Sequence, residues 1–389
     1  MAVAVKLGLA AAMLLVGAWT LGAMQGWRMA VLWCLGAGLG LVLFRASFGF
    51  AGAFRRLILD RRGLGLRAQM VMLGLAVCLF LPVLEAGSLF GTPVRGFVFP
   101  LGVALLLGAF LFGIGMQLGG GCGSGTLYAA GGGQESRMWI TLAAFIAGAT
   151  LAAWQGELWL DWPALPAISL LDRLGAGRAI ALSLAVFALV WCASAIVEQR
   201  RHGGVEALQW RGTGRMVWRG PWLLVWGAVA LAVLNFATLA IAGRPWAITA
   251  AFPLWGSRGV EFMGWDEPAF WTYWEDPTRT EALLRPLVAD RIGVMDLGLM
   301  LGAFCAAALA RRPADWRLPR PGAVAASVVG GLLLGIGATL GSGCNISAYF
   351  GGIASGSLHG WVWILPALAG NWVGVRLRPA FGLDTSSPI

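Results

Sequence analysis

The sequence predicts an all-α, polytopic membrane protein, and three observations indicate this fold class. Hydrophobic residues make up 59% of the 389 residues, charged residues make up only 12%, and the mean hydropathy is +0.77. Apolar runs of about 20 residues, the length that crosses a bilayer as a helix, recur along the chain. Arginines fall in short clusters between these runs, as in the cytoplasmic loops of membrane proteins. A soluble domain of this length would need far more polar surface.

About ten membrane-spanning helices and four shorter segments account for the apolar runs. The spanning helices are expected at 2–24, 28–45, 68–90, 96–117, 137–155, 178–198, 220–242, 290–311, 321–341 and 358–378. The short segments, which are bounded by Gly or Pro, are expected at 47–58, 121–132, 245–255 and 343–354. Residues 2–24 also resemble a signal peptide, but the next helix follows so closely that a retained first helix is expected.

Four groups of arginines predict the orientation of the chain in the membrane. The groups are Arg55, Arg56, Arg61, Arg62 and Arg67; Arg200, Arg201, Arg211, Arg215 and Arg219; Arg311, Arg312, Arg317 and Arg320; and Arg376 with Arg378. Ten crossings put all four groups on one side, which is expected to be the cytoplasm. Both termini then lie in the cytoplasm, and the acidic stretches 156–177 and 256–290 lie outside. The net charge of +10 therefore reflects topology and indicates no nucleic-acid partner.

A glycine-rich stretch around Cys122 recurs around Cys344. The sequences GIGMQLGGGCGSGTLYAAGGG at 113–133 and GIGATLGSGCNISAYFGGI at 335–353 align at a constant offset of 222 residues. The helices before them cross in opposite directions, so the two stretches enter the membrane from opposite faces. Inverted repeats with broken helices are the usual construction of a membrane transport site.

The repeat predicts how the chain is organised. We expect one integral membrane transport domain over 1–389, with inverted halves at about 28–198 and 220–378. The short segments near Gly49 and Trp246 are expected to form a further, more diverged pair.

The residues around the two cysteines predict a loosely held anion. A short helix that begins after each cysteine would turn its free N–H groups and positive dipole end toward the thiol. A thiol is a weak donor and a soft group, suited to a polarisable, sulfur-bearing anion. A thiolate would repel that anion, so neutral thiols are expected. The residues expected to contribute donors or a free backbone are Ser124, Thr126, Asn345, Ser347, Gly121, Gly123 and Gly343.

Several single features allow more than one interpretation. Either cysteine stretch alone would also fit a close-packed helix seam in which the cysteine is merely small. Trp246, beside Pro245, either lines the pathway or packs in the core, and Asp296 is a candidate as an intramembrane carboxylate. His359 is expected at a helix end. The sequence has no P-loop, CxxC or Ser/His/Asp pattern, so no metal, cofactor or ATP-driven step is expected.

Four motifs carry a resemblance to a known family. They are GGGCGSG around Cys122, GSGCNISAYFGGI around Cys344, GRPWAITAAFPLWG at 243–256 and FRASFGFAGAFR at 44–55. Together they resemble the YeeE/YedE family of bacterial inner-membrane transporters for sulfur-containing ions, of which thiosulfate is the known substrate class. The resemblance implies an hourglass-shaped helical protein with pseudo-symmetric re-entrant segments. It also implies three central cysteines whose thiols pass thiosulfate along by hydrogen bonds.

Cys122 and Cys344 match two of the three family cysteines, whereas Gly49, between Phe48 and Phe50, stands at the third position. The resemblance also implies a cytosolic sulfur-carrier partner of the TusA type. The predicted function is uptake of a small sulfur-containing anion, thiosulfate first, by a protein that is not an enzyme. The alternatives are transport of a selenium compound or sulfite, and a membrane persulfide or sulfur-transfer enzyme. The enzyme is disfavoured because both thiols are buried and no general base is apparent.

Overall fold

The structure, a computed structural model, describes residues 2–212, 216, 221–312, 314–315 and 317–384. Among these residues, nine helical segments are long and apolar enough to cross a membrane, and the strands form only two short antiparallel pairs. The chain is therefore a multi-pass membrane protein, and the predicted all-α fold class is confirmed. Arg215, Arg219 and the predicted helix start at 220 lie outside the described residues.

Ten long helices follow the order of the predicted spans. They are α1 (Ala2–Gln25), α2 (Trp27–Ala46), α4 (Leu64–Ala86), α5 (Val103–Gly119), α7 (Arg137–Trp154), α9 (Leu170–His202), α11 (Leu224–Ala242), α14 (Arg291–Leu309), α15 (Pro321–Leu340) and α17 (Leu358–Leu377). Helix α17, the tenth predicted span, is not among the nine segments of the described chain that are long and apolar enough to cross a membrane. It has 20 residues, but His359, Asn371 and Arg376 lower its hydropathy.

Glycine and proline shift several boundaries from the predicted ones. Helix α4 ends four residues before the predicted 68–90 span does, because Gly87 adopts φ 72° and terminates it. Helix α5 begins well inside the predicted 96–117 span, because Pro100 and the extended Gly102 precede it. The residues before α5 instead form β3 (Leu101–Gly102), which pairs with β4 (Ala164–Leu165). The other pair is β1 (Ser88–Leu89) with β2 (Thr92–Pro93).

Helix α9 is longer than the predicted 178–198 span, at both ends. It is interrupted at Gly175, where φ is 76°. Asp172, expected in the 156–177 loop, lies in its first turn, and Arg200 and Arg201 lie in its last turn. An acid at the start and bases at the end of a helix complement its dipole, which favours this extension. The same loop also contains α8 (Gly156–Trp159).

The four short segments are helical at the predicted places. They are α3 (Phe50–Asp60), α6 (Gly123–Gly131), η1 (Ile248–Ala250) continuing into α12 (Ala251–Phe262), and η5 (Asn345–Phe350) continuing into α16 (Gly351–Ala354). The predicted loop 256–290 is wrong at its start, because α12 runs through Phe262 and buries Phe252, Leu254 and Ser257. The rest of that loop contains short helices, namely η2 (Pro268–Phe270), η3 (Thr272–Trp274), α13 (Pro277–Leu284) and η4 (Leu287–Ala289).

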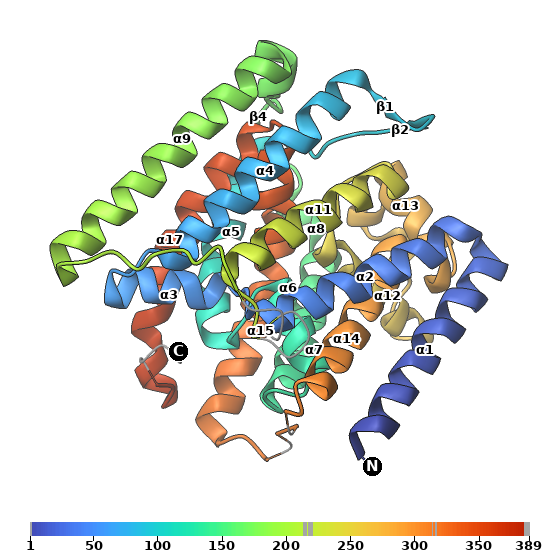
Figure 1. The fold of residues 1–389 in the computed structure, drawn as a ribbon. Coiled ribbons are helices and arrows are strands. Elements are labelled where there is room, and N and C mark those ends of the chain that lie inside the picture. The colour runs from blue at the N-terminus through green and yellow to red at the C-terminus, as the bar shows by residue number, and fades with distance from the viewer. Residues whose placement is uncertain (1, 213–215, 217–220, 313, 316, 385–389) are drawn as a thin grey trace.

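The long helices pack around α5 and α15, which contact each other. Helix α17 packs on α5 and α7 packs on α15, while α2 packs on α14 and α4 packs on α11. Helices α1 and α9 lie at opposite edges of the bundle, and the short α6 lies between them (Figure 1). The chain ends with η6 (Arg378–Phe381), which contacts α15 and α17. The first residues of the four short segments are buried within this packing.

Candidate functional site

Each cysteine of the repeat stands directly before a short helix. Cys122 is the N-cap residue of α6 and Cys344 is the N-cap residue of η5, and both have an extended backbone. The two side chains are 1% and 0% exposed. Both thiols are therefore buried, next to the helix end whose N–H groups lack helical partners.

The thiol of Cys344 is held by two donors. The backbone N–H of Ile346 donates to Sγ at 3.4 Å, and the hydroxyl of Ser347 donates to it at 3.6 Å. The same Ser347 Oγ accepts from the backbone N–H of Cys344 at 2.9 Å, which completes a reciprocal cap. Since both contacts use sulfur as the acceptor, the S–H proton stays available to a further acceptor.

The thiol of Cys122 has a different side-chain environment. Its Sγ lies 3.4 Å from Ser124 Oγ, and either atom can be the donor. No side-chain cap bond forms at this helix start, although the Thr126 N–H donates to the Cys122 carbonyl at 2.8 Å. Cys122 is therefore buried as deeply as Cys344, but it takes part in no side-chain cap.

The glycines of the repeat have two separate roles. Gly343 has φ 131°, and a side chain there would overlap Ser347, while a Cβ at Gly121 would lie 2.9 Å from the Thr126 backbone nitrogen. These two glycines let the chain turn tightly before the short helices. Further upstream, Gly113 packs against the backbone of α17 and Gly335 against that of α7. The close-packed seam is thus real, but it lies before the cysteines.

Three of the four short segments meet at Cys344. A Cβ placed on Gly123, the first residue of α6, would lie 3.4 Å from Cys344 Sγ and 3.0 Å from Thr249 Cγ2. Thr249 belongs to η1, and its hydroxyl lies 3.4 Å from Ser347 Oγ. The starts of α6, η1 and η5 therefore converge on one thiol.

Two polar side chains at these helix starts have no partner. Asn345 is fully buried, and neither its amide nitrogen nor its amide oxygen has a hydrogen-bond partner among the described residues. The hydroxyl of the buried Thr126 is also unpartnered there. An unpaired buried polar group costs about 1–3 kcal/mol, so such groups call for an explanation. A polar ligand or water beside the two thiols would satisfy them.

Gly49 lies at the start of the fourth short segment. It is the N-cap residue of α3 with φ −115°, and a Cβ there would lie 3.7 Å from the hydroxyl of Tyr128 in α6. The next residue, Phe50, packs edge-on against Tyr349 of η5 with ring centroids 6.4 Å apart. The third family position is therefore linked to both cysteine segments through tyrosines.

Sequence reasoning missed Tyr128, Tyr349 and Thr249. A usable signal existed for the tyrosines, because the chain has only three and two of them follow a repeat cysteine within seven residues. Thr249 had no comparable signal, because its segment differs in sequence from the other three.

Trp246 and Asp296 contact each other behind η1. The indole N–H of Trp246 donates to Asp296 Oδ1 at 3.2 Å, and the other carboxylate oxygen has no partner among the described residues. Trp246 is 2% exposed and lies two residues before Ile248, where η1 begins. The pair thus anchors the segment that carries Thr249. His359 lies in the first turn of α17, as expected, and contacts Ser357 Oγ at 2.7 Å.

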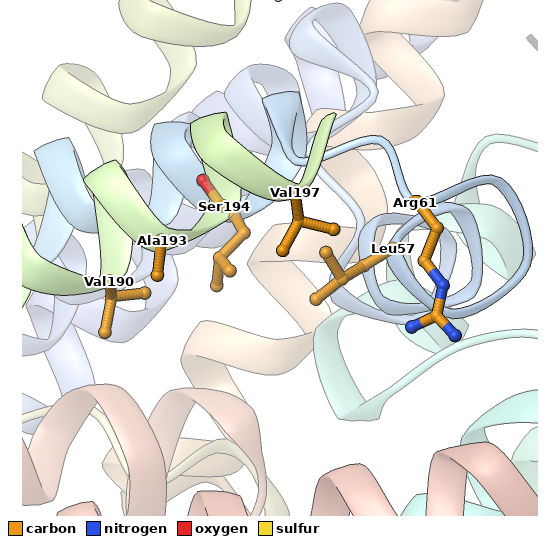
Figure 2. Close-up of a pocket in the computed structure, with 7 residues that line it drawn as sticks. Leu57, Arg61, Val190, Ala193, Ser194 and Val197 are labelled. Atoms are coloured by element: carbon orange, nitrogen blue, oxygen red, sulfur yellow. The ribbon is translucent and has the colours of Figure 1, made fainter. Parts of the chain in front are cut away.

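A separate groove lies between α3, α4 and α9 (Figure 2). Its volume is about 330 Å³, and its lining is apolar except for Arg61 and Ser194. It includes no residue of either cysteine segment. The thiols are therefore enclosed by packed helices and do not line this groove.

These features define a class of protein, a helical membrane transport protein with broken helices at its centre. The chain belongs to the family described as "Sulphur transport", whose model matches residues 45–373. The predicted YeeE/YedE relationship is thereby confirmed.

Individual relatives agree with this membership. The chain is 36% identical over 153 residues to the probable transporter YedE of Salmonella typhimurium, and 34% identical over 153 residues to that of Escherichia coli. Each match covers 38% of this chain and only 36% of the relative's length. The chain is also 28% identical over 352 residues to the thiosulfate transporter TsuA of Spirochaeta thermophila, covering 86% of this chain and 94% of that relative.

Proposed function

We propose that the protein carries a small sulfur-containing anion, thiosulfate first, across the bacterial inner membrane into the cytoplasm. Membership of a sulphur-transport family supports the sulfur-containing substrate. The name of the relative TsuA, which matches most of this chain, supports thiosulfate in particular.

The observation that carries the proposal is the convergence of two buried thiols on the starts of two short helices. The backbone of Gly123 brings the Cys122 segment against Cys344 Sγ, and the unpartnered Asn345 and Thr126 lie at the same helix starts. Helix N-termini attract anions, and neutral S–H, O–H and amide groups add donors. Neither segment contains Lys or Arg, so the anion is held loosely enough to move on.

Pseudo-symmetric halves at about 28–198 and 220–378 are part of the proposal. Across the two halves, α5 corresponds to α15 and α7 to α17, so the α7–α15 contact is the counterpart of the α17–α5 contact. In the same way, α2 corresponds to α11 and α4 to α14, so the α2–α14 contact is the counterpart of the α11–α4 contact. This pairing supports an inverted repeat within one transport domain. The arginine groups support cytoplasmic termini and an outer position for the short helices that follow α12.

A cytosolic sulfur-carrier protein of the TusA type is the proposed acceptor on the inner side. The support for it is the family resemblance, and the basic inner face offers a surface for an acidic or anionic partner.

Uptake of labelled thiosulfate into cells that lack other importers tests the function. Cys122→Ala and Cys344→Ala are each expected to lower the uptake rate at least about tenfold, because each removes a central donor. Cys192→Ala, at an exposed cysteine, is the matched control and is expected to leave uptake unchanged. Uptake that survives both central substitutions would contradict the thiol pathway.

Two further readouts separate the alternatives. Uptake that is inhibited by selenite or sulfite more strongly than by thiosulfate would favour another chalcogen substrate. A mass increase of about one sulfur atom on Cys122 or Cys344 after exposure to substrate would favour the persulfide enzyme.

A further inference from the structure

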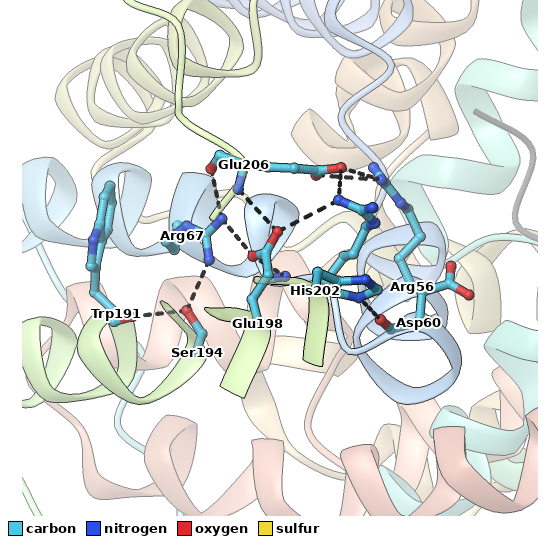
Figure 3. Close-up of polar contacts among 10 residues, drawn as sticks. Arg56, Asp60, Arg67, Trp191, Ser194, Glu198, His202 and Glu206 are labelled. Atoms are coloured by element: carbon cyan, nitrogen blue, oxygen red, sulfur yellow. Dashed lines mark hydrogen bonds and ion pairs between the residues drawn. The ribbon is translucent and has the colours of Figure 1, made fainter. Parts of the chain in front are cut away.

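Arginines of the first basic group are paired with acids of α9 and the segment after it. Arg67 contacts Glu198 at 2.8 Å, while Arg62 and Arg56 contact Glu206 at 2.6 and 3.3 Å. Figure 3 shows Arg56, Arg67, Glu198 and Glu206 in this network, which ties α9 to the junction of α3 and α4. The positive charges of Arg56, Arg62 and Arg67 are therefore neutralised by Glu198 and Glu206.

Arg55, the neighbour of Arg56 on α3, is different. Its side chain is only 9% exposed, and it makes no hydrogen bond or ion pair with any described residue. Its Nε is buried without a partner. Removing a guanidinium from water costs several kcal/mol unless an anion or acceptor replaces the water, so this position favours a ligand.

Geometry places two other guanidinium groups near Arg55. One turn before it, the carbonyl of Ala51 accepts from Gln117 Nε2 at 3.0 Å, which joins α3 to the end of α5. At that end, the Gln117 carbonyl accepts from Arg378 at 2.6 Å, and the Leu118 carbonyl accepts from Arg137 at 3.2 Å. Arg137 and Arg378 therefore bind the last turn of α5, and the helix that carries Arg55 is joined to the same turn; these three arginines form the arginine cluster.

Few acids balance this arginine cluster. Glu135 pairs with Arg137 at 2.6 Å, and Arg378 bonds to the backbone carbonyl of Asp384. Burial lowers the pKa of Arg378 to about 10, and the positive charges of Arg55 and Arg137 contribute to that shift, against the opposing charges of Glu135 and Asp384. At Arg55 itself the charge of Arg137 is opposed by the charges of Glu135 and Asp60.

The arginine cluster lies just beyond the thiols. Helix α5 ends at Gly119, three residues before Cys122, and α3 begins after Gly49. Six residues of helix carry the chain about 9 Å from Gly49 to Arg55, toward the cytoplasmic arginines.

We propose that Arg55 binds the anion in an inner site, completed by Arg137 and Arg378, after the anion has passed the two thiols. This inference rests on the proposed function. A guanidinium donates two parallel N–H bonds to the terminal oxygens of a tetrahedral sulfur oxyanion, which a thiol cannot do. A weak central site followed by a stronger inner site draws the anion inward.

Thermal unfolding of the purified full-length protein tests the site without relying on transport. Sodium thiosulfate is the probe, and sodium chloride at equal ionic strength is the control. Ligand binding raises Tm in proportion to occupancy, so an apparent Kd follows from the titration. Arg55→Gln is expected to raise that Kd at least about tenfold, and Arg55→Lys, which keeps the charge but loses the fork, about threefold.

Two controls make the result decisive. Arg56→Gln removes the adjacent arginine and is expected to leave the Kd unchanged. Its acidic partner, Glu206, still forms an ion pair with Arg62 in this variant. The double variant Cys122→Ala, Cys344→Ala is expected to retain the Arg55-dependent binding. An unchanged Kd in Arg55→Gln, or no thiosulfate-dependent shift in the native protein, would overturn the inner site.

The outcomes also separate this inference from the proposed function. Absent uptake together with Arg55-dependent binding would remove the transport proposal and leave the site. If uptake depends on the thiols but Arg55→Gln alters neither uptake nor binding, the transport proposal stands and the inner site is removed.

Discussion

The two cysteine segments occupy matching positions of the repeat but cap their helices differently. Cys344 precedes a π-helix and takes part in a reciprocal cap with Ser347, whereas Cys122 precedes an α-helix with no side-chain cap. The Cys344 thiol accepts from the Ile346 N–H and the Ser347 hydroxyl, whereas the Cys122 thiol has Ser124 Oγ as its side-chain partner. The difference indicates that a side-chain cap fixes the Cys344 thiol and that no such cap fixes the Cys122 thiol.

The sequence difference behind this asymmetry is small. At the offset of 222 residues, Ser347 corresponds to Gly125 and Asn345 corresponds to Gly123. Glycine at 125 removes the capping hydroxyl, and glycine at 123 lets the first segment approach Cys344 Sγ. One segment therefore provides the fixed contact, and the other provides the space.

Substitution of the turn glycines should give the largest effect. Gly343→Ala places a side chain at φ 131° and against Ser347, and is expected to cost about 3 kcal/mol of folding free energy. Gly121→Ala, its counterpart, has no positive φ and is expected to cost about 1 kcal/mol. Tm and folded yield in detergent measure both. Equal losses would mean that the two turns are equivalent and that the asymmetry starts only after the cysteines.

Much of this architecture could be predicted because composition and arginine spacing determine where helices cross. The short helices after Cys122 and Cys344 followed from glycine-rich breaks in apolar runs. The start of α5 could not be predicted, because the apolar residues just before it pair as β3 with a strand distant in the sequence.

Within the site, prediction found the local residues and missed the distant ones. Ser347 was expected as a donor, yet its role as a cap depends on the φ of Gly343. The approach of Thr249 and Tyr128 depends on how four segments pack, which no single stretch encodes. The sequence placed Arg55 only in a basic group. What distinguishes it from its neighbour Arg56 is the ion pair of Arg56 with Glu206, a residue 150 positions away, which only the folded structure shows.

The unpartnered amide of Asn345 gives the next prediction. Asn345→Ala removes both unpaired amide atoms, so stability should stay unchanged or rise by about 1 kcal/mol, while uptake falls about tenfold. Thr126→Val, which removes the unpartnered hydroxyl of the other segment, should lower uptake less, about threefold. Thiosulfate uptake and Tm are measured together. A large loss of Tm in Asn345→Ala would mean that the amide is satisfied within the protein and contacts no anion.

The cap itself can be removed from one segment and added to the other. Ser347→Ala should cost about 1 kcal/mol, the usual value for an N-cap hydrogen bond. Gly125→Ser has room, since the nearest atom to its Cβ is Cys122 Sγ at 3.6 Å, and should gain about 0.5 kcal/mol. The Tm shifts should have opposite signs. If a cap on Cys122 leaves thiosulfate uptake unchanged, the absence of a cap in the native protein has no part in conduction.

The smallest effect is expected at Gly49, the position without a thiol. Its φ of −115° suits any residue, and the nearest atom to a new Cβ is the Tyr128 hydroxyl at 3.7 Å, so Gly49→Cys should fold normally. A third weak donor, placed between the central thiols and Arg55, should raise thiosulfate uptake about twofold. Gly49→Ala adds the same Cβ without sulfur and should leave uptake unchanged. If alanine gives the same gain, the benefit comes from a stiffer helix start and not from the thiol. If cysteine lowers uptake while alanine does not, the native glycine keeps this end free of an extra binding step, and the two-thiol centre is complete as it stands.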